Sequence, residues 1–118
     1  MKSKEFIRGT LKTIILKLLS EKEKMYGYEI SQRVAELSKD EIQLTYGALY
    51  PILYKLESEK LLTTTSEIVE NRARKYYSLT DLGRGIAAEK VSELQRFNEA
   101  LKNILAPGPI TSLNLGTT

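Results

Sequence analysis

The sequence contains no cysteine, no histidine and no tryptophan. The lack of cysteine excludes a disulfide framework and a thiolate metal site. The lack of histidine removes the most frequent general base and the most frequent metal ligand. Nucleophile-elbow, dinucleotide-binding and P-loop motifs are also absent. The sequence therefore gives no support for an enzyme, and we expect neither a metal nor a cofactor.

Long apolar runs are missing as well. No run approaches the roughly 18 apolar residues that cross a membrane as a helix. The N-terminus, MKSKEFIRG, has neither the apolar region nor the small-residue cleavage site of a secretory signal. Hydrophobic residues make up 42% and charged residues 28% of the 118 residues, as is ordinary for a globular domain. We therefore expect a cytoplasmic protein without a membrane partner.

The charges are spread evenly along the chain except at one point. A net charge of +3 is only a weak sign of a polyanionic partner, since many proteins without one have a similar charge. Three cations, Arg72, Arg74 and Lys75, nevertheless fall within four residues. A local basic cluster indicates nucleic-acid binding better than the net charge does.

Apolar residues recur at helical spacing in three segments before residue 60. The first segment is 5–20, within which Thr10 is a candidate N-cap, and the second is 26–38. The third is 45–58, with Thr45 as its candidate N-cap. We therefore expect three helices in this half of the chain.

The third segment combines a proline with a row of tyrosines. Tyr46, Tyr50 and Tyr54 recur every fourth residue, on a face separate from the apolar one. Pro51 removes a backbone donor, which costs ~3 kcal/mol inside a regular helix. Since Pro51 lies about one turn from Thr45, we predict that it stiffens the first turn and fixes the angle of Tyr46 and Tyr50. For Tyr54 the pattern is equally consistent with packing.

A change of composition after residue 60 predicts two strands. Segment 61–68, LLTTTSEI, is rich in β-branched residues, and segment 74–79, RKYYSL, contains two aromatic residues. The polar turn 70–73 joins them into a hairpin with a charged tip. Tyr76 and Tyr77 must point to opposite faces of their strand, so one of them belongs to the core. The pattern does not decide which one.

A last helix is predicted from Thr80, whose hydroxyl is its candidate N-cap, to about Leu105, and Pro107 ends it. At ~24 residues it would be about 36 Å long, more than a core of this size can cover. Its apolar residues have the 3-4-3 spacing of a helix pair, which packs either on the first helix of the chain or on a second copy. We favour a homodimer, and we expect the tail 107–118 to be flexible. The predicted dimer interface consists of Val91, Leu94, Phe97, Leu101 and Ile104.

Three helices, a hairpin and a further helix follow one another in the order of a winged helix-turn-helix. The predicted fold is mainly α with a small β-hairpin: residues 1–79 form a DNA-binding unit, 80–106 a dimerisation helix and 107–118 a tail. In this geometry the second helix of the pair enters the major groove, and the hairpin, or wing, meets phosphates. The predicted contacts to double-stranded DNA are Thr45, Tyr46, Gly47, Tyr50, Pro51, Lys55, Arg72, Arg74 and Lys75.

Four motifs resemble the PadR-like family of bacterial transcriptional regulators, in its short subfamily with one C-terminal helix. In chain order they are GTL at 9–11 with ILKLL at 15–19, YGYEI at 26–30, GALYPIL at 47–53, and RARKYYSLT at 72–80 followed by Gly83. Each motif alone is weak evidence of membership. LYP within a helix, joined to RKYYSLT, is specific.

The resemblance implies a homodimeric repressor that binds a pseudo-palindromic operator. It also implies a small-molecule effector that relieves repression by binding near the dimer interface, between the first and last helices. Drug-sensing members hold a planar drug between aromatic side chains, but this chain has no tryptophan for that role, so the effector stays unidentified. Lys60 and Asn71 stand where the family usually has glycine, so two turns must be made without it.

A second class of function stays open. Winged helices also serve as protein–protein modules, in which the third helix faces a protein partner instead of DNA. The basic wing favours DNA, because an interaction module need not keep it.

Overall fold

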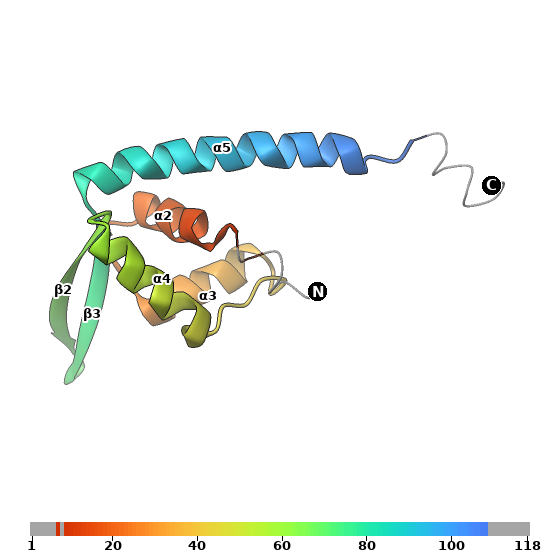
Figure 1. The fold of residues 1–118 in the computed structure, drawn as a ribbon. Helices are drawn as coiled ribbons and strands as arrows, with labels where there is room; N and C mark the ends of the chain where they lie inside the picture. The colour runs from red at the N-terminus through yellow and green to blue at the C-terminus, as the bar shows by residue number, and fades with distance from the viewer. Residues whose placement is uncertain (1–6, 8, 109–118) are drawn as a thin grey trace.

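The computed structural model describes residue 7 and residues 9–108, so most of the predicted tail, 109–118, lies outside the described part. Four helices and three strands follow one another in the described residues (Figure 1), and the predicted mainly α fold with a hairpin is confirmed. None of the described helices is both long and apolar enough to cross a membrane. The elements are α2 (Leu11–Glu21), β1 (Met25–Tyr26), α3 (Gly27–Leu37), α4 (Tyr46–Ser58), β2 (Leu62–Val69), β3 (Arg72–Leu79) and α5 (Asp81–Leu105).

Threonine hydroxyls cap two helices as the sequence predicts. The hydroxyl oxygens of Thr45 and Thr80 each accept the backbone N–H three residues ahead, over 3.2 Å at α4 and 2.9 Å at α5. Such a cap stabilises a helix by about 1 kcal/mol. Thr10 precedes α2 at the predicted position, but its hydroxyl donates to the carbonyl of Ile7 and does not cap the helix. The position of this cap was therefore predicted correctly, and its hydrogen bond was not.

The sheet has one strand more than predicted. Its order is β1-β3-β2, and both pairings are antiparallel. β1 consists only of Met25 and Tyr26, which pair with Tyr77 and Tyr76 about 50 residues later. Tyr26 was predicted to lie in a helix, and this was wrong because a strand of two residues is too short to show an alternating pattern.

β3 begins at Arg72, earlier than predicted, so the hairpin turn consists of Glu70 and Asn71 alone. Both residues have positive φ, 51° and 64°. This backbone gives a two-residue turn the same twist as the strands that it joins. Asparagine tolerates that region better than most residues, so no glycine is required at the turn. Lys60, after the end of α4, likewise adopts a φ of 64°.

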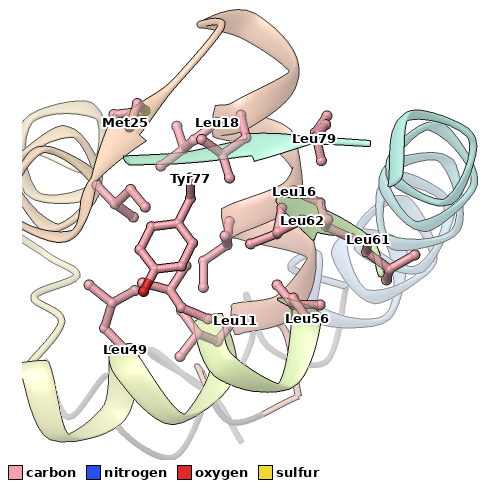
Figure 2. Close-up of a cluster of buried hydrophobic side chains, with 14 of the residues drawn as sticks. Leu11, Leu16, Leu18, Met25, Leu49, Leu56, Leu61, Leu62, Tyr77 and Leu79 are labelled. Atoms are coloured by element: carbon pink, nitrogen blue, oxygen red, sulfur yellow. The ribbon is translucent and has the colours of Figure 1, made fainter. Parts of the chain in front are cut away.

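The hydrophobic core lies between the sheet, α2, α3 and α4. Tyr77 is the core tyrosine, with 1% of its surface exposed, and Tyr76 is only half-buried. In Figure 2 the Tyr77 ring fills the space between β3 and α4, with its oxygen toward Leu49. Within the described residues that hydroxyl has no hydrogen-bond partner, and burial raises the pKa of Tyr77 to about 12. The other largest fully buried side chains are Ile15, Leu16, Leu19, Ile30, Leu49, Leu53 and Leu56.

Among the described residues, other elements cover only the first half of α5. Figure 1 shows α2 along this first half, while the second half extends beyond α2. At the start of α5, Gly83 lies so close to the backbone of Leu61 that a Cβ atom would overlap with the carbonyl oxygen. The N–H of Thr80 donates to the same carbonyl over 3.0 Å. These contacts hold the start of α5 against Leu61, the residue that precedes β2.

Candidate nucleic-acid interface

The first turns of α4 form an exposed surface. The helix is continuous through Pro51, so the proline does not break it. Its buried face carries Leu49, Leu53 and Leu56 into the core, which leaves the opposite face for solvent. Of the predicted contacts on α4, Tyr50 is half-buried, and the exposed ones are Thr45, Tyr46, Gly47, Pro51 and Lys55.

Tyr46, Tyr50 and Tyr54 form one aromatic row along α4. The ring centres of Tyr46 and Tyr50 are 5.6 Å apart, and those of Tyr50 and Tyr54 are 5.9 Å apart. The end of the Tyr50 ring rests on Gly27, where a Cβ atom would overlap with the hydroxyl oxygen. Partial burial raises the pKa of the Tyr50 phenol. Tyr50 therefore packs between α3 and α4 and also belongs to the exposed row.

The hairpin of β2 and β3, residues 62–79, forms the wing, and β3 divides its basic cluster between two faces. Side chains alternate along a strand, so Arg72 and Arg74 lie on the face turned away from the core, and Lys75 lies on the core side. Lys75 Nζ is 3.6 Å from the Glu57 carboxylate on α4 and 5.4 Å from the centre of the Tyr54 ring. The charge of Lys75 is thus partly neutralised beside α4, whereas Arg72 and Arg74 lie together on the other face of β3.

Arg74 lies against an aromatic cluster that the sequence analysis did not include in the site. Its Nη1 donates to the hydroxyl of Tyr26 over 2.9 Å, and its guanidinium carbon is 4.6 Å from the centre of the Tyr26 ring. The Tyr26 ring stacks on Tyr28 at 6.3 Å and meets Tyr76 edge-on at 5.5 Å. The Arg74 guanidinium is therefore held by the Tyr26 ring, which is itself packed against Tyr28 and Tyr76.

A recess of about 420 Å³ opens between the start of α3, the start of α4 and the wing. Phenols and guanidinium groups line it, and both donate hydrogen bonds that suit a phosphate. The YGYEI motif contains the two tyrosines that were missed, but only the pairing of β1 with β3 brings them beside the wing. This tyrosine–arginine recess is lined by Tyr26, Tyr28, Tyr46, Arg72, Ala73 and Arg74.

The predicted dimer residues follow one face of α5. Val91 and Leu94 are half-buried, whereas Phe97, Leu101 and Ile104 are 61%, 38% and 77% exposed. Packing on α2, the alternative considered from the sequence, accounts for the first half of α5 only. The second half carries an apolar stripe that the described residues leave uncovered.

The helices, the wing and the exposed first turn of α4 together define a winged helix-turn-helix protein. A family model described as the transcriptional regulator PadR-like family matches residues 15–89. The chain therefore belongs to the PadR-like family of transcriptional regulators, as its four motifs indicated.

Known relatives are similar in sequence and in structure. A transcriptional regulator of Mycobacterium tuberculosis is 34% identical over 86 residues, which cover 73% of this chain and 77% of that protein. A PadR-like transcriptional regulator from Bacillus cereus is 28% identical, with a TM-score of 0.74 over 88% of this chain and 99% of that one. A transcriptional regulator from Clostridium thermocellum is 27% identical, with a TM-score of 0.77 over 86% of this chain and 99% of that one. These relatives are named as regulators and not as enzymes.

Proposed function

We propose that the protein is a sequence-specific DNA-binding regulator that acts in the cytoplasm as a homodimeric repressor. The observation that carries this proposal is the exposed first turn of α4 beside a wing that presents Arg72 and Arg74. A duplex that receives the first turn of α4 in its major groove would bring its backbone to the wing.

Two kinds of contact contribute to binding in this proposal. The wing cations contact phosphates, which gives affinity and register without sequence information. Tyr46 and Tyr50 face the base edges from the first turns of α4, and Lys55 contacts a phosphate further along the helix. Pro51 fixes the angle of those turns, so a Pro51→Ala variant should lose operator affinity or stability. A variant unchanged in both would contradict this role.

The uncovered stripe of α5 supports the homodimer. Phe97 and Ile104 are too exposed for core residues, and pairing with the same stripe of a second copy would remove them from water. A two-fold dimer demands two half-sites about one helical turn apart, ~34 Å along the duplex. A pseudo-palindromic operator follows from this symmetry.

A second recess supports the proposal that an effector relieves repression. It lies between α2 and α5, has a volume of about 360 Å³ and is lined in part by Lys17, Arg84 and Val91. Val91 also belongs to the predicted dimer interface. A molecule bound there could change the angle between α5 and α2, and so the spacing of the two DNA-binding units.

The test compares two variants on a duplex selected from a random pool and on an unrelated duplex, over a range of salt concentrations. Arg74→Ala should weaken binding to both duplexes similarly and lower the salt slope of the dimer by about 1.8, about 0.9 for each protomer. Tyr50→Ala should weaken binding to the selected duplex much more than to the unrelated one. If Arg74→Ala abolished sequence preference and left the salt slope unchanged, the role of the wing would be wrong.

The exposed isoleucine near the wing tip favours a second candidate, a protein–protein module. Ile68 is 74% exposed, and Tyr46 and Tyr54 are each about half exposed, as in a surface that binds a protein. A DNA column distinguishes the two functions, because a DNA-binding protein is retained at low salt and released as salt rises. No retention at low salt would favour the interaction module.

A further inference from the structure

Tyr26 is placed to hold the side chain of a DNA-binding arginine. Its backbone is paired with Tyr76 in the sheet, and its N–H donates to the Glu29 carboxylate over 3.1 Å. Its ring is packed against Tyr28 and Tyr76. The hydroxyl of Tyr26 is thus a fixed hydrogen-bond acceptor at the edge of the tyrosine–arginine recess.

Arg74 keeps most of its binding capacity in this arrangement. A guanidinium has five N–H donors, and Tyr26 accepts only one of them. The ring beneath the guanidinium is neutral, so the positive charge is not cancelled. Two adjacent donors are enough to bind a phosphate in the bidentate manner that arginine favours.

A carboxylate that could compete for Arg74 is occupied elsewhere. Glu67 is the cross-strand partner of Arg74 in the wing. Its carboxylate forms an ion pair with Lys24, whose Nζ also lies 5.0 Å from the centre of the Tyr76 ring. Among the described residues Glu67 thus pairs with Lys24 and not with Arg74, which leaves the guanidinium available to an external anion.

We propose that Tyr26 is a positioning residue for DNA binding, which holds the Arg74 guanidinium at the recess for a backbone phosphate of the duplex. This inference rests on the proposed DNA-binding function. A free arginine side chain must lose rotamer freedom when it binds a phosphate, and an arginine already held by a ring and a hydroxyl loses less. Tyr28, half exposed at the rim, adds a second phenol to the same phosphate site.

The test measures binding of a fluorescent selected duplex, from low to high salt, by the full-length protein and its variants. Tyr26→Phe keeps the ring and removes only the acceptor. We expect it to weaken binding about three- to tenfold at every salt concentration, with the salt slope of the unmodified protein. Arg74→Ala should weaken binding further and lower the slope by about 1.8, about 0.9 for the phosphate contact of each protomer. In the double variant Tyr26→Phe should have no additional effect, because Tyr26 acts through Arg74.

Tyr77→Phe is the matched control, because it removes a phenol hydroxyl that is buried in the core and should leave affinity unchanged. Arg74→Lys is a second variant that disturbs the same contact and leaves Tyr26 intact, so its result does not depend on the folding of Tyr26→Phe. It keeps the positive charge and loses the planar fork, and it should also weaken binding without changing the salt slope. The inference is overturned if Tyr26→Phe binds like the unmodified protein, or if it weakens binding equally in the Arg74→Ala background. If the unmodified protein shows no salt-dependent binding to any duplex, the proposed function itself fails.

Discussion

The tyrosine–arginine recess draws its side chains from three separate segments of the chain, whereas the exposed stripe of α5 comes from a single helix. Tyr26, Tyr46 and Arg74 meet only because the sheet and the helix pair have already formed. The recess is therefore complete within one chain. The stripe has apolar side chains on one face and nothing among the described residues to cover them, and in the proposed dimer a second copy would cover it.

This difference separates two causes of exposure. Apart from Ala73, the side chains at the recess are polar or aromatic; Tyr26 is held by a hydrogen bond from Arg74 and by ring contact with Tyr28, while free donors stay open to solvent. The apolar side chains of the stripe are unfavourably exposed to water, because burying one such side chain stabilises by about 1.5–3 kcal/mol. We infer that the recess is built to bind a hydrated polyanion and the stripe to exclude water.

The largest expected effect falls on the stripe. Phe97→Glu would place a charge in the centre of an apolar interface, and we expect dimer dissociation to become at least a hundredfold easier, about 2.7 kcal/mol or more. Asn103→Glu adds the same charge on the opposite face of α5 and should leave the dimer intact. Sedimentation at several protein concentrations measures both. An unmodified protein that is monomeric at micromolar concentration would contradict the account of α5.

The next largest effect tests the packing at the start of α5. Gly83→Ala would force a Cβ atom against the Leu61 carbonyl, and overlap with backbone cannot be relieved by a side-chain rotation. We expect a loss of about 2–3 kcal/mol in the free energy of unfolding. Gly85→Ala lies two residues further on, where a Cβ atom meets nothing, and it should stabilise by about 0.5–1 kcal/mol.

Urea unfolding at one protein concentration compares these two glycine variants, since dimer stability depends on concentration. If Gly83→Ala proved as stable as Gly85→Ala, α5 would not be held against the Leu61 backbone as the structure shows.

The smallest expected effect lies in the core, at Tyr77. The buried hydroxyl has no partner among the described residues, so Tyr77→Phe should leave stability at pH 7 unchanged or raise it by about 1 kcal/mol. The pKa of Tyr77 in the folded protein is about 12, against an ordinary value near 10, so ionisation favours the unfolded chain. The stability that depends on a protonated Tyr77 is therefore complete below pH 10 and is lost as the pH rises toward 12.

Over that pH window the unmodified protein should lose about 2–3 kcal/mol that Tyr77→Phe retains. Unfolding by urea at pH 9 to 12 measures the difference between the two proteins. Equal losses in both would show that this hydroxyl is hydrated or bonded in solution. DNA affinity at pH 7 should not change, because this hydroxyl is buried in the core and does not line the recess.

Local signals in the sequence were sufficient for most of the fold. Thr45 and Thr80 were identified as caps because a hydroxyl just before an apolar-periodic segment signals the start of a helix from neighbouring residues alone. Both helices begin there. Pro51 was correctly placed inside a continuous helix. β1 was missed, because the partners of its two residues lie about 50 residues away.

The candidate site was harder to predict than the fold. Arg72, Arg74 and Lys75 form one cluster in the sequence, but strand alternation divides them between two faces. Which face each takes depends on which of Tyr76 and Tyr77 enters the core, and composition does not decide that. Tyr26 and Tyr28 joined the site only through the pairing of β1 with β3. Contacts that depend on tertiary pairing were therefore the ones that the sequence could not supply.

Footprinting of the unmodified protein on a selected duplex tests the central claim most directly, because the result depends on both surfaces. The account predicts two protected segments related by two-fold symmetry, with centres about one helical turn, ~34 Å, apart. Phe97→Glu should lose this paired protection at concentrations where the unmodified protein keeps it. A single unsymmetrical protected segment, or none at low salt, would contradict the account.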